Sequence, residues 1–212
     1  TDSSVAALYK AKIDGMEIFS LTRLPIDDKT EIAADEKRLV VRTEVSGKSE
    51  WFNNEAPPDN LNPDSVRRFI ELTHEKYKAI AGEYFGKTVP GIFTDEPSLA
   101  DRHTSFAKNR GWIPWTNGFA DYFKEQRGYD IFDTLPYIYF NHEKSPKARH
   151  DYWRTVSQRY AESYSKVIGQ WCTQNGIAYT GHFLQEDKLG LCTRVNGSIM
   201  PHYRYQQVPG ID

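Results

Sequence analysis

After an N-terminal stretch, helix-like and strand-like segments alternate along the chain, and each strand-like segment runs into acidic residues. Apolar side chains recur with the 3.6-residue period of an amphipathic helix, and short apolar runs typical of buried strands follow them. The pairs of helix and strand are 62–84 with 88–97, 145–174 with 177–184, and 196–207 with the run that ends at Asp212. This order favours parallel strands. We therefore expect an α/β fold, a portion of a parallel (β/α) barrel of the TIM type, with fewer units than a complete barrel of roughly 250 residues.

The N-terminal residues have a different pattern, which predicts a small antiparallel β element. Asp14-Gly15 is a strong hairpin signal, because both central residues of a type I′ turn take positive φ. A further strand is expected over 38–45, and a loop rich in asparagine and proline follows it. We therefore divide the chain into an antiparallel β appendage or insertion, residues 1–50, and the barrel portion, residues 51–212.

The composition disfavours several classes of protein. The 212 residues carry 27 Lys and Arg against 29 Asp and Glu, so the chain lacks the positive surplus that nucleic-acid binding needs. No apolar run reaches the roughly 18 to 20 residues that cross a bilayer, so we expect no membrane span. Two cysteines are too few for a disulfide framework or a zinc site. The motifs of phosphate loops, serine esterases and zincins are absent from the sequence.

Asp95 and Glu96, at the end of the first predicted parallel strand, are the strongest candidates for chemistry. Parallel α/β folds bind ligands at the carboxyl ends of their strands, and Pro97 favours an extended conformation for Glu96. Because neighbouring strand residues face opposite sides, only one side chain of the pair aims at the site. We favour Glu96, with Asp95 orienting it or binding a cation. The alternative is a helix N-cap or a surface ion pair.

His182, Glu186 and Asp187 form a second cluster, at the end of the next predicted parallel strand. His182 either hydrogen-bonds a substrate hydroxyl or is an ordinary core histidine, and Glu186 offers a second carboxylate. Glycoside hydrolysis uses two carboxylates, one to donate a proton and one to activate water or attack the anomeric carbon. The second carboxylate is Glu186, Asp212 or a residue beyond the end of the chain. Clustered carboxylates such as Asp95 and Glu186 also suit calcium.

Aromatic and amide side chains in the loops fit a sugar ligand. Trp51, Trp112 and Trp115 lie near amide and hydroxyl side chains such as Asn53, which combines flat apolar faces with groups that bind hydroxyls. We expect Trp51, Asn53 and Trp115 to contact the sugar. At least one tryptophan is expected to cover the core instead.

Several motifs together resemble large bacterial glycosidases. They are Trp51-Phe52-Asn53, Leu61-Asn62-Pro63, Phe69-Ile70-Glu71-Leu72-Thr73-His74-Glu75, Pro90-Gly91-Ile92-Phe93-Thr94-Asp95-Glu96-Pro97, Thr180-Gly181-His182 and Pro209-Gly210-Ile211-Asp212. In combination they are similar to glycoside hydrolase family 106, the α-L-rhamnosidases, and the resemblance covers about Trp51 to Asp212.

This resemblance implies an inverting hydrolase with a (β/α)8 catalytic barrel, β-rich accessory domains and a calcium ion near the substrate. It places the catalytic glutamate at Glu96, in the Asp-Glu-Pro motif, and another glutamate on a later strand. It also implies a fragment of a larger enzyme whose polypeptide continues past Asp212 into other domains. The protein is then expected to be periplasmic or secreted, in a bacterium.

We therefore expect the catalytic domain of a glycosidase that acts on side chains of plant or microbial polysaccharides, with α-L-rhamnosides as the implied substrates. Glu96 is the expected general acid, and Glu186 the base or a cation ligand. The expected substrate contacts are Asp95, His182, Trp51, Asn53, Trp115 and Asp212. Two alternatives stay open: a carbohydrate-binding pseudoenzyme that does not cleave, and a metal-dependent hydrolase of an ester or amide whose ion is held by Asp95, His182 and Glu186.

Overall fold

The computed structural model of the chain describes residues 3–99 and 111–212. Contacts between residues divide the chain into two compact units. The units are Thr1–Ser46 with Asn117–Tyr152, and Gly47–Thr116 with Trp153–Asp212. A compact unit is not by itself a domain that folds alone. The division into domains 1–50 and 51–212 therefore stays a prediction.

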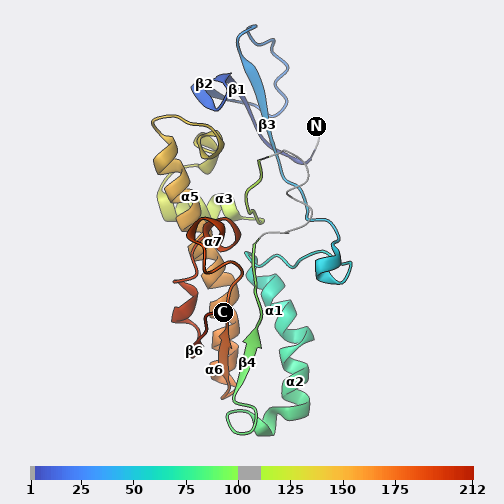
Figure 1. The fold of residues 1–212 in the computed structure, drawn as a ribbon. Helices are drawn as coiled ribbons and strands as arrows, with labels where there is room; N and C mark the ends of the chain where they lie inside the picture. The colour runs from blue at the N-terminus through green and yellow to red at the C-terminus, as the bar shows by residue number, and fades with distance from the viewer. Residues whose placement is uncertain (1–2, 100–110) are drawn as a thin grey trace. The chain divides into compact units, whose positions relative to one another are not determined.

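The first unit contains an antiparallel sheet with the strand order β2-β1-β3 (Figure 1). Its strands are β1 (Val5–Asp14), β2 (Glu17–Leu24) and β3 (Lys37–Arg42). Asp14 pairs with Glu17 across a tight turn in which Gly15 has φ 55°. The predicted hairpin is therefore confirmed.

Short helices complete the first unit. They are α3 (Phe119–Arg127), η4 (Ile131–Asp133), α4 (Pro136–Tyr139) and the first part of α5 (Ser145–Tyr160). Ala11 and Ile18 of the sheet pack against Tyr137 and Ala148 in a buried apolar cluster.

The second unit is built around a parallel sheet with the strand order β4-β5-β6 (Figure 1). Its strands are β4 (Gly91–Thr94), β5 (Ala178–Gly181) and β6 (Val208–Pro209). Thr94 is in register with Gly181, and Gly181 is in register with Pro209. The predicted parallel pairing is confirmed, and the carboxyl ends of the three strands lie side by side.

The predicted portion of a TIM-type barrel is wrong. The parallel strands form a three-stranded sheet, and the other three strands in the described part of the chain form the separate antiparallel sheet. Six strands divided in this way do not make a barrel of eight parallel strands. The alternation of helix and strand indicates that strands are parallel, but open sheets and barrels share it.

The helix predicted over 62–84 is divided in the structure. Asn62 caps its start by accepting the N–H of Asp64 at 3.0 Å. The chain leaves the helical conformation at Thr73, where φ is −123° and ψ is −70°. The segments of this region are η1 (Glu50–Phe52), α1 (Pro63–Leu72), α2 (His74–Ala81) and η2 (Gly82–Tyr84).

The helix predicted over 196–207 is wrong. Helix α7 (Leu189–Asn196) ends where the prediction began, because Gly197 has φ 76° and leaves the helical region. Only the short turn η6 (His202–Arg204) lies between α7 and β6.

The long helix predicted over 145–174 is present, with one irregularity. Between α5 and α6 (Lys166–Gln174) the backbone forms a π-helical turn, η5 (Ala161–Ser165). In α6 and the adjoining strand, Ile168 and Tyr179 are fully buried. Among the helices of the described ranges, none has the length and apolar composition that crossing a membrane requires.

Candidate active site

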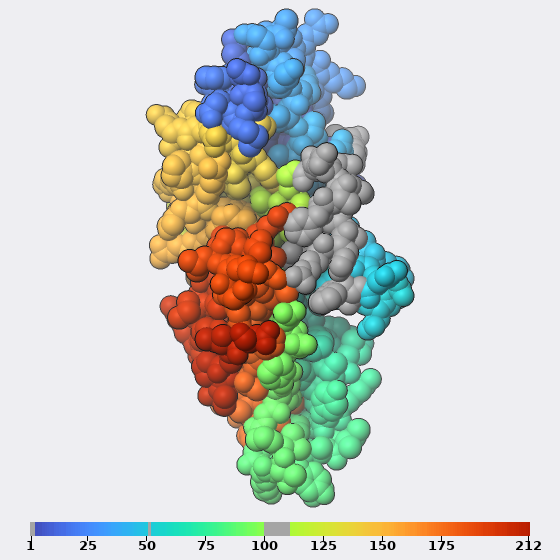
Figure 2. All heavy atoms as spheres, viewed as in Figure 1, coloured from blue at the N-terminus to red at the C-terminus, as the bar shows by residue number. Residues whose placement is uncertain are grey.

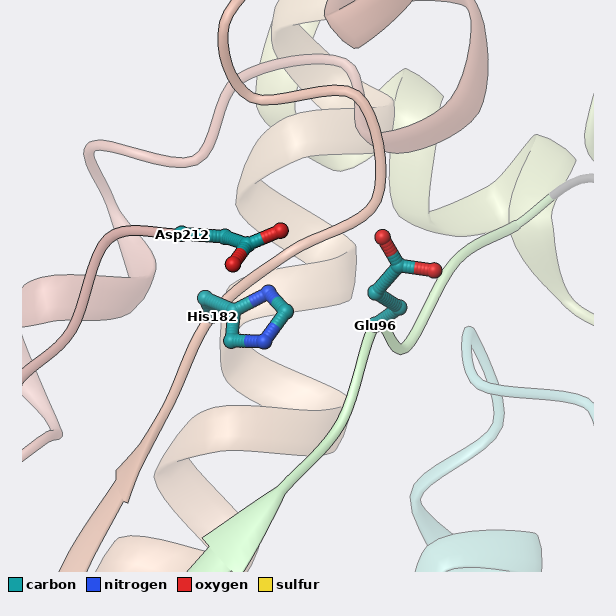
Figure 3. Close-up of side chains that lie close together, drawn as sticks. All are labelled: Glu96, His182 and Asp212. Carbon is teal, nitrogen blue, oxygen red and sulfur yellow. The ribbon is translucent and has the colours of Figure 1, made fainter.

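Three side chains converge where the parallel strands end. Glu96 follows β4, His182 follows β5 and Asp212 follows β6 (Figure 3). One ligand atom from each, a carboxylate oxygen or a ring nitrogen, lies within 4.8 Å of the other two. The space-filling view shows the end of the chain at the surface beside the segment that contains β4 (Figure 2). We call Glu96, His182 and Asp212 the strand-end cluster.

Two glycines allow the strand ends to approach this closely. Gly181 has φ 137°, and a Cβ atom there would lie 2.1 Å from the carbonyl oxygen of Thr94. A Cβ atom on Gly210 would lie 2.8 Å from the carbonyl oxygen of Gly181. Real Cβ contacts are longer than either distance, so a side chain at these positions would push the strands apart. The cluster therefore depends on residues that carry no functional group.

Glu96 reaches the cluster through an unusual backbone conformation. Its φ is 45°, in the left-handed region that side chains other than glycine seldom adopt. The expected extended conformation before Pro97 is therefore absent. The turn separates Glu96, which is half-buried, from Asp95, which is exposed.

His182 lies between the acidic residues with its two ring nitrogens in different surroundings. Nε2 lies 3.2 Å from Oδ1 of Asp95. Nδ1 is buried and has no hydrogen-bond partner among the described residues. The ring also packs edge-on against Phe93, with centroids 5.5 Å apart. Asp95 thus lies against one ring nitrogen of His182, and the other has no protein partner among the described residues.

Glu186 lies beside the cluster and is occupied by backbone groups. One carboxylate oxygen accepts the N–H of Phe183 at 3.2 Å, and the other accepts the N–H of Asp212. Burial raises the pKa of the Tyr203 phenol, and the charge of Glu186 adds to this rise. Glu186 therefore connects the loop after β5 with the end of the chain.

The loop residues predicted to bind sugar have varied surroundings. Asn53 is exposed, in a turn where its φ is 54°. Trp115 is half-buried, whereas Trp112 packs on the buried residues Leu184 and Val195. The side chain of Trp51 lies outside the described part of the structure. The sugar contacts of Trp51, Asn53 and Trp115 stay predictions.

The donor atoms of the strand-end cluster do not favour calcium. Calcium takes six to eight oxygen ligands, and a cluster of two carboxylates and one imidazole suits zinc or a similar transition metal better. Asp95 and Glu186 are the pair predicted to bind a metal. In the structure Asp95 lies against His182, whereas Glu186 accepts a backbone N–H. The expected calcium ion stays a prediction.

A search of the sequence for acidic residues at strand ends does not reveal every part of the site. Asp212 is predicted as a substrate contact and as one possible second carboxylate, but its hydrogen bond to Glu186 joins residues far apart in the chain. Gly181 carries a weak signal, because a glycine at the end of an apolar strand often marks the close approach of another backbone.

No protein-family model and no curated protein matches the chain. Among solved structures, a rhamnosidase from Novosphingobium sp. PP1Y is similar over 74% of this chain, with 20% sequence identity and a TM-score of 0.47. The chain spans 15% of the length of that rhamnosidase. This similarity is too low to support an assignment of function, which depends on the geometry of the site itself.

Proposed function

We propose that the strand-end cluster is the catalytic site of a glycoside hydrolase. Glu96 is the proton donor to the leaving oxygen, and Asp212 is the second carboxylate. The observation that carries this proposal is the convergence of Glu96 and Asp212 on His182 from separate strand ends. Glycoside hydrolysis needs two carboxyl groups on either side of one bond, in opposite protonation states.

Asp212 is a better second carboxylate than Glu186 in this proposal. Both oxygens of Glu186 accept backbone N–H groups, and moving either away would leave a donor without its partner. Asp212 has an exposed side chain and faces the cluster (Figure 3). Glu186 then acts on the reaction by holding the backbone of Asp212.

His182 is the proposed contact for a sugar hydroxyl. When Nε2–H donates to Asp95, the lone pair of Nδ1 is left as an acceptor. A hydroxyl is the group that such a buried acceptor binds best. Asp95 therefore sets the tautomer of His182 rather than touching the scissile bond.

Hydrolysis of a panel of aryl glycosides tests this proposal, with α-L-rhamnosides first because of the motif that contains Glu96. Glu96→Gln keeps the shape of the side chain but removes the acid, so cleavage should fall by roughly 10²-fold or more. Glu83→Gln, at an exposed glutamate in η2, is the matched control and should cleave like the parent chain. Failure to cleave any glycoside, or equal cleavage by Glu96→Gln, contradicts the proposal.

A metal-dependent hydrolase is the second candidate, because Glu96, His182 and Asp212 present three ligand atoms in one place. A bound zinc ion would supply an activated water for attack on an ester or amide. Calorimetric titration with Zn²⁺ tests this reading in the parent chain and in His182→Gln. Tight binding that His182→Gln abolishes, together with activity on esters or amides that a chelator removes, favours the second candidate over the first.

A further inference from the structure

The backbone at Glu96 requires support from its surroundings. A non-glycine residue in the left-handed region persists only where neighbouring structure fixes the segment. Two chains of hydrogen bonds flank Glu96, one before it and one after it. Both begin at the π-helical turn η5.

The first chain of hydrogen bonds fixes the segment after Glu96. Ser163 Oγ donates to the carbonyl oxygen of Asn60 at 2.6 Å. Asn60 Nδ2 in turn donates to the carbonyl oxygen of Ser98 at 2.9 Å. Ser163 is 1% exposed and Asn60 is 8% exposed, so water cannot easily replace either bond. Ser98, which follows Glu96 and Pro97, is thereby tied to η5.

The second chain fixes the segment before Glu96. Thr94 Oγ1, on the last residue of β4, donates to the hydroxyl of the buried Tyr179 at 3.4 Å. That hydroxyl lies 3.3 Å from Ser165 Oγ, in η5. Burial raises the pKa of Tyr179, so its hydroxyl keeps its proton near neutral pH.

The π-helical turn explains how one short segment supplies both supports. The N–H of Lys166 donates to the carbonyl of Ala161, five residues earlier, instead of four. Ser163, Tyr164 and Ser165 are consecutive and all buried. Consecutive side chains of a regular α-helix face different directions. The wider turn lets Ser163 and Ser165 both bond to the interior, to Asn60 and Tyr179.

We propose that Ser163 and Tyr179 are positioning residues that hold Glu96 in place for proton donation, acting through Asn60 and Thr94. We call this pair of supports the η5 clamp. The part that concerns proton donation rests on the proposed glycoside hydrolase function. The part that concerns the backbone around Glu96 does not.

Single variants test the η5 clamp against matched controls. Ser163→Ala and Tyr179→Phe each remove one hydroxyl of the clamp. Ser157→Ala removes a buried hydroxyl that donates within α5, to the carbonyl of Trp153 at 2.7 Å. Tyr160→Phe removes a buried hydroxyl without a hydrogen-bond partner in the described part of the chain. The controls therefore match the test variants in residue type and burial, and in the described part of the chain neither control hydroxyl is hydrogen-bonded to the clamp.

Two substrates with different leaving groups distinguish a misplaced acid from a loss of folded protein, because both causes lower activity. A methylumbelliferyl leaving group needs a proton, whereas a dinitrophenyl leaving group departs without one. Ser163→Ala and Tyr179→Phe should lower kcat about tenfold or more on the first and less than about twofold on the second. Loss of folded protein would lower both rates equally. Both controls should cleave both substrates like the parent chain.

Hydrogen exchange tests the η5 clamp without any activity. The N–H of Leu99, which follows Ser98, donates to the carbonyl of Val195 at 2.7 Å. Exchange at Leu99 should be about tenfold faster in Ser163→Ala than in Ser157→Ala. Thr94→Val removes the hydroxyl that donates to Tyr179 and should have the same effect. Exchange that matches the controls in all three clamp variants overturns the proposal. A parent chain that cleaves no glycoside contradicts the proposed function, and exchange alone then decides the clamp.

Discussion

The carboxylate of Glu186 accepts the backbone N–H of Asp212, so an acidic side chain from the loop after β5 fixes the end of the chain after β6. The same carboxylate accepts the N–H of Phe183. The position of Glu186 after a strand predicts a catalytic role. Its contacts are instead suited to holding the backbone of neighbouring segments. The carboxylate that it supports faces Glu96 and His182 (Figure 3).

Glu186→Ala should lower glycoside cleavage about tenfold, because Asp212 loses the bond that fixes its backbone. Glu186→Gln keeps an oxygen acceptor and should retain more activity than Glu186→Ala. Asp187→Ala is the control, since Asp187 is exposed and pairs only with Lys188 at 3.6 Å among the described contacts. Rates measured under saturating substrate compare the three. Equal activity of Glu186→Ala and Asp187→Ala would show that Asp212 needs no such support.

Gly181→Ala should destabilise the second unit by at least about 2 kcal/mol, because the new Cβ atom meets the carbonyl of Thr94 at 2.1 Å and φ is 137°. Gly190→Ala is the opposite case. Gly190 lies in α7, and a Cβ atom there would meet no neighbouring side chain or distant backbone within 4 Å, so alanine should stabilise the helix by up to about 1 kcal/mol. Urea denaturation of both variants measures the difference. A Gly181→Ala chain as stable as the parent would mean that the strand ends can separate freely.

His202 should make stability depend on pH in the mildly acidic range. Burial lowers its pKa to about 3, while Ser165 Oγ lies 2.8 Å from Nδ1 and the Tyr160 ring packs against it. An unfolded chain binds a proton at this histidine below about pH 6.5, and the folded chain does not until about pH 3. The free energy of unfolding should therefore fall as pH drops through this window.

His202→Gln removes this titration. The parent's free energy of unfolding should change more steeply with pH than that of the variant, by up to about 1.4 kcal/mol per pH unit. Urea denaturation between about pH 4.5 and pH 7.5 gives both slopes. Parallel slopes would show that His202 is accessible to protons in the folded chain.

Asp95→Asn should disturb the tautomer of His182, because an amide can present its NH₂ group where a carboxylate oxygen lies 3.2 Å from Nε2. Nitrogen NMR shifts of the imidazole distinguish the two tautomers directly. We expect a single tautomer in the parent, a mixture in Asp95→Asn and about tenfold lower cleavage. Asp187→Asn, remote from the imidazole in the described contacts, should leave both readings unchanged.

The local signals in the sequence are sufficient to predict several elements. Asp14-Gly15 predicts a hairpin because positive φ is a local requirement. The apolar runs before Asp95 and after Gly176 predict strands, and these strands pair in parallel. The predicted burial of the first strand is wrong, because Phe93 is exposed. Sheet closure has no such local signal, which is why the sequence predicts a barrel where the structure has an open three-stranded sheet.

The residues of the strand-end cluster are predictable from the sequence, but the contacts that surround them are not. Glu96, His182 and Asp212 are candidates because each follows a predicted strand. The hydrogen bond of Glu186 to Asp212 and that of Ser163 to Asn60 join residues far apart in sequence, and no periodicity records them. The π-helical turn also has no signal, because one widened turn hardly changes the apolar period of a long helix.

The left-handed backbone at position 96 makes a glutamate there costly to the stability of the fold. Glycine or asparagine would adopt this conformation at lower cost, so selection for stability alone would replace the glutamate. Under the proposed function, the need for the carboxyl group retains it. Relatives of this chain without that function should then drift to glycine or asparagine at this position, while keeping Gly181, which the packing of the sheet requires in any case.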